Sequence, residues 1–185
     1  MEHFRLYGLI LVLLVLSSVI CRAEDNSICV HDIDSMYRKG TLVTDDSYKV
    51  GVTDFVTYTI TGGSNARFWM QDSYTYICIC LPGKNDMVTT SKITNLKRVN
   101  FTYGPVNQDY LAGDFPTMQI LVSEDGDEWT NLSSIAVHGR ASAEVLLPSP
   151  GDYYLRIKNT GSSKPIYIRT FEYKTQHCNC FRYQP

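Results

Sequence analysis

Apolar and polar residues alternate with a period of two along most of this chain, and this pattern constrains the fold more than any other feature. The clearest stretch is residues 55–61, in which Val56, Tyr58 and Ile60 fall on one face and three threonines on the other. Side chains of a β-strand point alternately to the two faces of a sheet. The stretch therefore predicts a strand with one buried face.

Turn-forming residues separate this stretch from further alternating segments. These segments are residues 67–70, 74–81, 96–103, 118–122, 143–147, 153–157 and 166–170. Asp125-Gly126 predicts a tight turn, and so do residues 148–152, which read Pro-Ser-Pro-Gly-Asp. About nine or ten short strands without helical periodicity predict an all-β fold. We expect an antiparallel β-sandwich, a jelly roll, forming one domain over residues 24–185.

The first 23 residues have the pattern of a cleavable secretion signal. Arg5 precedes an apolar block at residues 9–16, and small residues follow up to Ala23. Because this block is shorter than the ~20 residues that span a bilayer, we expect cleavage after Ala23 and no retained anchor. The pattern predicts a secreted or periplasmic protein with no membrane segment once the signal is removed.

The charge balance gives no sign of a polyanionic partner. The chain carries 17 basic and 19 acidic side chains, and the signal removes Arg5, Arg22 and Glu2. The remaining net charge of about −3 provides no basic surface for nucleic acid or an anionic membrane.

Loss of Cys21 with the signal leaves an odd number of cysteines. They are Cys29, Cys78, Cys80, Cys178 and Cys180. Residues two apart in a strand share a face, so each Cys-x-Cys pair projects together. In an exported protein we expect disulfides, either between the two pairs or from Cys29 to the C-terminal pair, with one thiol free or bonded to another chain. A zinc site of four thiolates is the alternative.

Residues 91–173 resemble the galactose-binding-like jelly-roll superfamily, and within it the accessory domains of secreted Bacteroidetes proteins. The likeness lies in a strand that ends in Ser123-Glu124-Asp125-Gly126-Asp127-Glu128-Trp129 and a later strand that begins Gly151-Asp152-Tyr153-Tyr154-Leu155-Arg156-Ile157. This resemblance implies a jelly roll of a kind whose members bind glycans or cell surfaces, or flank another domain.

Aromatic residues close in sequence to an arginine are the candidate binding site. Arg67, Trp69, Tyr74 and Tyr76 could form a platform, because exposed rings stack on sugar faces while arginine binds hydroxyls. Trp129 follows a turn, and we expect it to anchor the core.

Asp32 and Asp34 could supply oxygen ligands to a structural calcium ion, and we expect no other cofactor. Asn100-Phe101-Thr102 and Asn131-Leu132-Ser133 fit the N-glycosylation pattern, with Asn100 on the outward face of its strand.

Local signatures of enzymes are absent from the sequence. No His-Glu-x-x-His, Gly-x-Ser-x-Gly or phosphate-binding glycine loop occurs. The sequence therefore favours a non-catalytic secreted module that binds carbohydrate or a cell-surface partner. Two alternatives stay open: an assembly protein with an inter-chain disulfide, and a glycoside hydrolase with a carboxylate pair drawn from distant strands.

Overall fold

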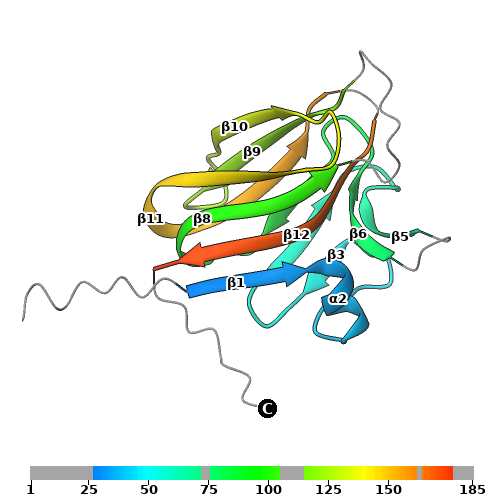
Figure 1. Cartoon of the computed structure of the whole chain (residues 1–185), viewed down its shortest axis with the longest axis horizontal. Coiled ribbons are helices and arrows are strands. Elements are labelled where there is room, and N and C mark those ends of the chain that lie inside the picture. The colour runs from blue at the N-terminus through cyan, green and yellow to red at the C-terminus, as the bar shows by residue number, and fades with distance from the viewer. Residues whose placement is uncertain (1–26, 72–75, 105–114, 162–163, 177–185) are drawn as a thin grey trace, which may run out of the picture.

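The computed structural model describes residues 27–71, 76–104, 115–161 and 164–176, so the predicted signal lies outside the described residues (Figure 1). The described residues form twelve strands and one short helix. They are β1 (Ser27–Asp32), α2 (Ile33–Arg38), β2 (Val43–Thr44), β3 (Val50–Val52), β4 (Thr57–Thr61), β5 (Arg67–Gln71), β6 (Tyr76–Leu81), β7 (Met87–Thr90), β8 (Ile93–Gly104), β9 (Thr117–Ser123), β10 (Thr130–Ala136), β11 (Ala141–Asn159) and β12 (Ile166–Thr175). The all-β prediction is confirmed.

One sheet, sheet A, is built around β12. β8 pairs with β12 along one side, while β6 and β1 lie end to end along the other side, all antiparallel (Figure 1). β5 extends the sheet beyond β6, and the first part of β11 extends it beyond β8. The first and last strands are therefore neighbours, and the last strand also lies beside β6.

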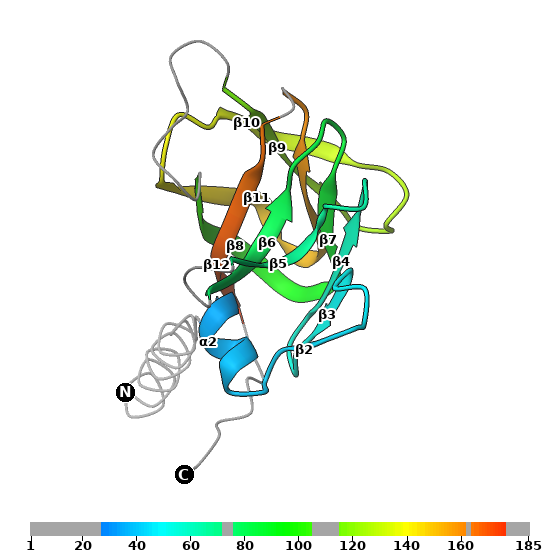
Figure 2. The ribbon, with the colours of Figure 1, turned by 90° about the vertical axis from the view of Figure 1, so that its right-hand side faces the viewer.

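The second sheet, sheet B, has the order β10-β9-β11-β7-β4-β3-β2, again antiparallel throughout. Here β11 contributes only its last residues, 154–159. The long strand thus leaves sheet A and continues in sheet B, which joins the two layers of the sandwich (Figure 2).

The predicted turn at residues 148–152 is wrong, because these residues lie within β11. The pairing of β11 with β8 is interrupted between Leu146 and Gly151, where Pro148 and Pro150 have no N–H to donate. The backbone nevertheless stays extended, because the φ angle fixed by proline is compatible with a strand. The prolines therefore mark the place where the strand changes sheets.

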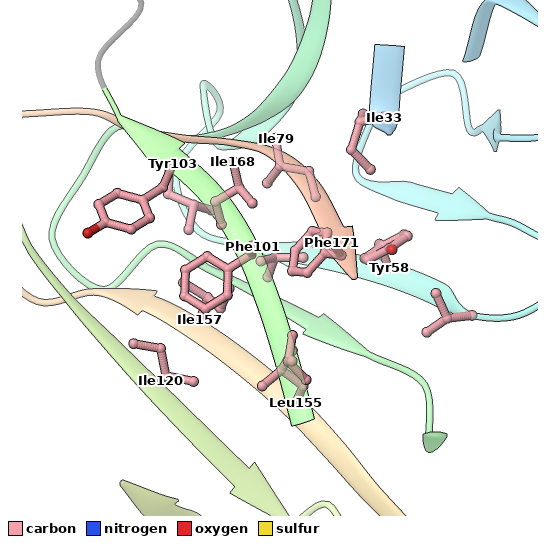
Figure 3. Close-up of a cluster of buried hydrophobic side chains, with 14 of the residues drawn as sticks. Ile33, Tyr58, Ile79, Phe101, Tyr103, Ile120, Leu155, Ile157, Ile168 and Phe171 are labelled. Carbon is pink, nitrogen blue, oxygen red and sulfur yellow. The ribbon is translucent and has the colours of Figure 1, made fainter. Parts of the chain in front are cut away.

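The core lies between the sheets and draws side chains from both. Phe101, Ile168 and Phe171 from sheet A face Ile120 and Ile157 from sheet B (Figure 3). All five are at most 1% exposed. Burial of such side chains supplies the main driving force for folding.

A bulge in β12 interrupts the alternation expected for this segment. Ile166 and Ile168 are buried as expected, whereas Thr170 is only half-buried and Phe171 and Tyr173 point inward instead. The register with β8 shifts between Ile168 and Thr170. An extra residue at such a shift reverses the alternation that follows it.

The short elements near the N-terminus were not predicted from the sequence. α2 has six residues, too few for a 3.6-residue period to show, and Asp32 caps it by accepting a hydrogen bond from the Ser35 N–H at 2.8 Å. The helix lies against the start of β6 (Figure 2). Among the described residues, no helix is long and apolar enough to cross a membrane.

Candidate functional site

The outer face of sheet A carries residues in regular rows that cross β1, β12, β8 and β11. Residues opposite one another in register share a face, so the pairings define which side chains lie together. Three such rows are Ile28–Lys174–Arg98–Leu146, Val30–Glu172–Asn100–Glu144 and Asp32–Thr170–Thr102–Ser142. The first row has apolar and basic side chains. The second has two carboxylates and one amide, and the third has three hydroxyls.

A groove of about 470 Å³ lies over the second and third rows. We call it the outer groove. Its lining combines the carboxylates, hydroxyls and amide of these rows with the apolar side chain of Val30. Asn100 lies at its centre, on the outward face as predicted, between Glu172 and Glu144.

Hydrogen bonds order the polar side chains of the outer groove. Asn100 Nδ2 donates to Glu172 Oε1 at 3.1 Å, and the hydroxyls of Thr102 and Thr170 lie 2.7 Å apart. Asn100 Oδ1 is buried, and no described residue donates a hydrogen bond to it. A buried acceptor without a donor costs stability.

Arg98 joins the two glutamates at the edge of the groove. Its Nη1 lies 3.1 Å from Glu144 and its Nη2 lies 3.7 Å from Glu172. The guanidinium balances part of the negative charge and fixes both carboxylates as oriented hydrogen-bond acceptors.

An aromatic patch continues the same face over β5, β6 and β12. It consists of Trp69, Tyr76 and Tyr167 with Arg67 and Arg169. The rings of Trp69 and Tyr167 are 5.5 Å apart between centroids, and the Arg169 guanidinium lies 5.4 Å from the centre of the Tyr76 ring. Burial raises the pKa of Tyr76, and Arg169 opposes this effect. Both Trp69 and Tyr76 are half-buried.

Three of the four predicted platform residues thus share one face of sheet A. Arg67, Trp69 and Gln71 are spaced two residues apart on β5 and so share a face, and Tyr76 on β6 is paired with Gln71. Tyr74 lies outside the described residues. Tyr167 and Arg169 were not predicted as part of this platform, because they come from β12, about 90 positions later in the chain. Their alternation with Ile166 and Ile168 indicated an outward face, but not which strand would lie beside them.

Cys78 and Cys80 lie beneath this patch and share its face, as predicted. Their register partners are Trp69 for Cys78, and Arg67 and Tyr167 for Cys80. Both are buried free thiols, and burial raises the pKa of each to about 12. Cys178 and Cys180 lie outside the described residues, so their predicted disulfides stay a prediction.

Asp32 and Asp34 have structural roles that account for both carboxylates. Asp32 caps α2, whereas Asp34 accepts from the Ile77 N–H at 3.0 Å and binds Arg38 at 2.9 Å. Among the described residues, no group of three or more His, Cys, Asp or Glu side chains could hold a metal ion.

A buried polar network on β1, β4 and β12 was not foreseen. His31 Nδ1 lies 2.7 Å from the Tyr58 hydroxyl, which accepts from the Tyr173 hydroxyl at 3.0 Å. Cys29 Sγ lies 3.3 Å from Nε2 of the same histidine. The alternation of Cys29 and His31 within β1 was the available signal.

Trp129 is half-buried and lies outside the core, contrary to expectation. Its ring stacks on Arg156 at 3.6 Å, and its Nε1 donates to the Gly126 carbonyl. The preceding turn is as predicted, since Asp125 accepts from the N–H groups of Asp127 and Glu128. These hydrogen bonds lower the Asp125 pKa to about 2.

No family model and no curated protein matches the sequence. Among solved structures, the chain is similar to the K2 cleaved adhesin domain of Lys-gingipain, with 10% identity, 80% of this chain and 99% of that chain covered, and a TM-score of 0.52. It is also similar to a mutant of CBM29-2, a family 29 carbohydrate-binding module, complexed with cellulohexaose, with 13% identity, 81% and 92% coverage and a TM-score of 0.51.

A third likeness is to a family two carbohydrate esterase from Cellvibrio japonicus, at 9% identity and a TM-score of 0.48. It covers 81% of this chain but only 34% of the esterase, and so it carries no argument about activity. The likenesses to the adhesin domain and to the carbohydrate-binding module show the fold alone: this chain is an antiparallel β-sandwich, as predicted from the sequence.

Proposed function

We propose that this chain is an exported, non-catalytic module that binds carbohydrate on the outer face of sheet A. The observation that carries the proposal is that the outer groove and the aromatic patch lie on the same face of one sheet. Sugars present hydroxyls at their edges and C–H groups on their faces, so they need both kinds of surface.

The two parts of the face would divide the work of recognition. Glu144 and Glu172, whose side chains are partly exposed, accept hydrogen bonds from sugar hydroxyls. Trp69 and Tyr76 are half-buried aromatic side chains on the same face of the sheet, with Arg169 adjacent as a donor. A chain of several sugar units could contact both parts at once.

Two solved structures of similar fold support this proposal. One similar fold is described as a carbohydrate-binding module in complex with cellulohexaose, and another as an adhesin domain. Export would bring the module to extracellular or periplasmic glycans, in agreement with the signal pattern of residues 1–23.

One observation keeps hydrolysis as a second candidate function. Glu144 and Glu172 contact the same guanidinium, which places them within the ~5–10 Å range used by glycosidase carboxylate pairs. A glycosidase needs one of its carboxyls protonated, usually by an apolar environment. Here the two side chains are 49% and 35% exposed and bind Arg98, so binding is the better-supported function.

A glycan array followed by calorimetry with the best ligand tests the proposal. We expect Trp69→Ala and Glu144→Gln each to weaken binding by about tenfold or more, because both remove central contacts. Trp129→Ala is the matched control. The Trp129 ring is half-buried and stacks on Arg156 of sheet B, away from the proposed binding face, so this substitution should leave affinity unchanged.

The proposal fails if the intact protein binds no glycan, or if binding is indifferent to Trp69, Tyr76 and Tyr167. Release of new reducing ends from the bound glycan, abolished by Glu144→Gln or Glu172→Gln, would replace it with the hydrolase. Far-UV circular dichroism of each variant separates lost contacts from lost folding.

A further inference from the structure

Cys78 and Cys80 form a pair of buried thiols on one face of β6. They are two positions apart in the strand and so project together. Their exposed fractions are 2% and 5%, and both are free thiols. Ionisation of Cys80 opposes ionisation of Cys78 and raises its pKa, so the two groups lie close enough to interact.

The spacing of the two cysteines suits a bridging metal ion better than a direct bond. Positions two apart in an extended strand are separated by ~6.6 Å between Cα atoms. A disulfide, with its sulfurs ~2 Å apart, reaches this separation only at the upper end of its range. With metal–sulfur bonds of ~2.3 Å, an ion between two thiolates holds the sulfurs up to ~4.6 Å apart. The strand can therefore supply both ligands without bending.

Two arginines lie close enough to balance the charge of a dithiolate complex. Burial raises the pKa of both thiols to about 12, while Arg169 acts in the opposite direction on Cys78 and Arg67 does so on Cys80. Arg67 is also the register partner of Cys80 on β5. Two buried thiolates would repel each other strongly, and a cation between them removes most of this repulsion.

Two aromatic rings cover the thiols on the solvent side. Trp69 is the register partner of Cys78, and Tyr167 is that of Cys80. The ring centroids are 5.5 Å apart, and both side chains are half-buried. The rings limit the access of water to the sulfurs, and such shielding favours a weakly hydrated ion.

The number and kind of ligands point to one class of metal. In the part of the chain that the structure describes, no group of three or more His, Cys, Asp or Glu side chains could hold a metal ion. Zinc takes three or four protein ligands and calcium takes six to eight oxygens, so neither fits two thiolates. Soft sulfur ligands favour Cu(I), which is stable with two of them in line.

We propose that Cys78 and Cys80 bind one Cu(I) ion as a two-coordinate dithiolate beneath the aromatic patch. This inference does not depend on the proposed function. The ion replaces two thiol protons, which pass to the solvent, and the complex carries one negative charge. No electron is transferred.

An anaerobic Cu(I) titration against the chromophoric chelator bicinchoninate tests the proposal. The chain without its signal is reduced and refolded with Cu(I), so that entry past the rings is not limiting. All proteins carry Cys178→Ser and Cys180→Ser, and this parent should retain one Cu(I) per chain. Cys78→Ser and Cys80→Ser should each weaken binding more than ~100-fold, because each removes one of two ligands. Cys29→Ser is the matched control and should retain the ion.

Tryptophan fluorescence locates the ion with all three described cysteines in place, and so it decides the matter if a serine variant folds poorly. In Trp129→Phe, Cu(I) should quench the remaining emission of Trp69, which lies beside Cys78. In Trp69→Phe, the emission of Trp129 should not change. The apparent affinity should also rise about 100-fold per pH unit between pH 6 and 8, because two protons leave for each ion bound.

Three results would overturn the proposal. They are a parent protein that retains no Cu(I), retention by both single serine variants, and quenching that is equal at the two tryptophans. Disulfide mapping by mass spectrometry of the unsubstituted oxidised protein supplies a further check. A bond from Cys78 or Cys80 to another cysteine would contradict the proposal, since it would use a thiol that the ion requires.

Discussion

At the scale of single residues, His31 is the most unusual feature of the molecule. It is 1% exposed, and three aromatic rings meet its imidazole edge to face, from Phe55, Tyr58 and Tyr173. Burial lowers its pKa from 6.5 to about 4, although Asp54 acts in the opposite direction. The folded protein therefore holds a neutral imidazole at pH values where an exposed histidine carries a proton.

This depressed pKa predicts a loss of stability in weak acid. Below pH 6.5 the unfolded chain binds a proton at His31 that the folded chain refuses until about pH 4. The free energy of unfolding should fall across this window by roughly 3 kcal/mol, the equivalent of the pKa difference. Urea denaturation at a series of pH values between 7 and 4 measures the effect.

His31→Gln is the matching control, because it keeps a polar side chain but cannot titrate in this range. Its unfolding free energy should be lower at pH 7 and should change much less between pH 6.5 and 4. Asp125, with its pKa near 2, loses its stabilising effect only at lower pH and does not interfere. Equal pH dependence in both proteins would show that another group controls the acid transition.

At the scale of elements, one side chain ties the ends of three strands together. Asn159, fully buried at the end of β11, donates from Nδ2 to the carbonyl of Leu81 on β6 at 3.0 Å and to that of Lys164, just before β12, at 2.9 Å. Its backbone N–H and C=O also bond to Asp86 and Asn85 in the loop before β7. The end of β11 is thus fixed by polar contacts as well as by the core.

Asn159→Ala should lower the free energy of unfolding by about 2–4 kcal/mol, because two carbonyls lose their donor and a void is left. Asn159→Asp has nearly the same volume but presents oxygen to the same carbonyls, so it should destabilise at least as much. Asn65→Ala, in an exposed loop, should change stability by less than ~0.5 kcal/mol. Denaturant titration distinguishes the three, and a mild effect of Asn159→Asp would contradict the hydrogen-bonding explanation.

At the scale of the whole molecule, the two sheets are joined by one strand and one core. β11 pairs in sheet A and then in sheet B, and the buried residues of both layers form a single cluster. Neither layer could keep its inner face away from water without the other. The two sheets should therefore unfold together.

The two tryptophans allow this prediction to be tested, because Trp69 lies in sheet A and Trp129 lies just before β10 of sheet B. In Trp129→Phe the remaining fluorescence reports on sheet A, and in Trp69→Phe it reports on sheet B. Within each variant, the urea transitions seen by fluorescence and by far-UV circular dichroism should coincide. Transitions with separate midpoints in either variant would show that the sheets unfold independently.

Much of this architecture could be predicted from local sequence. Tyr58 and Ile60 on β4 and Met118 and Ile120 on β9 are buried as their alternation indicated. The prediction failed where an interaction with a neighbouring strand overrides local pattern. Residues 148–152 have turn chemistry but continue a strand, and the bulge before Thr170 depends on its pairing with β8.

The candidate site divides in the same way. The shared face of Arg67, Trp69 and Tyr76 follows from short-range alternation, so the sequence predicted it. The outer groove draws Glu144, Asn100 and Glu172 from three strands far apart in the chain. No spacing in the sequence relates these residues, because strand order is a long-range property.

The sequence by itself determined the class of fold, the inward and outward faces of most strands, and the tight turn at Asp125. These depend on the period of the backbone and on local hydrogen bonds, which act over a few residues. Only the tertiary structure decided which strands are neighbours, and hence that an acidic, hydroxyl-rich groove shares one face of sheet A with the aromatic patch and that Tyr167 lies beside Cys80. Pairing between strands depends on burying two faces against each other across the whole chain, and no local segment carries that information.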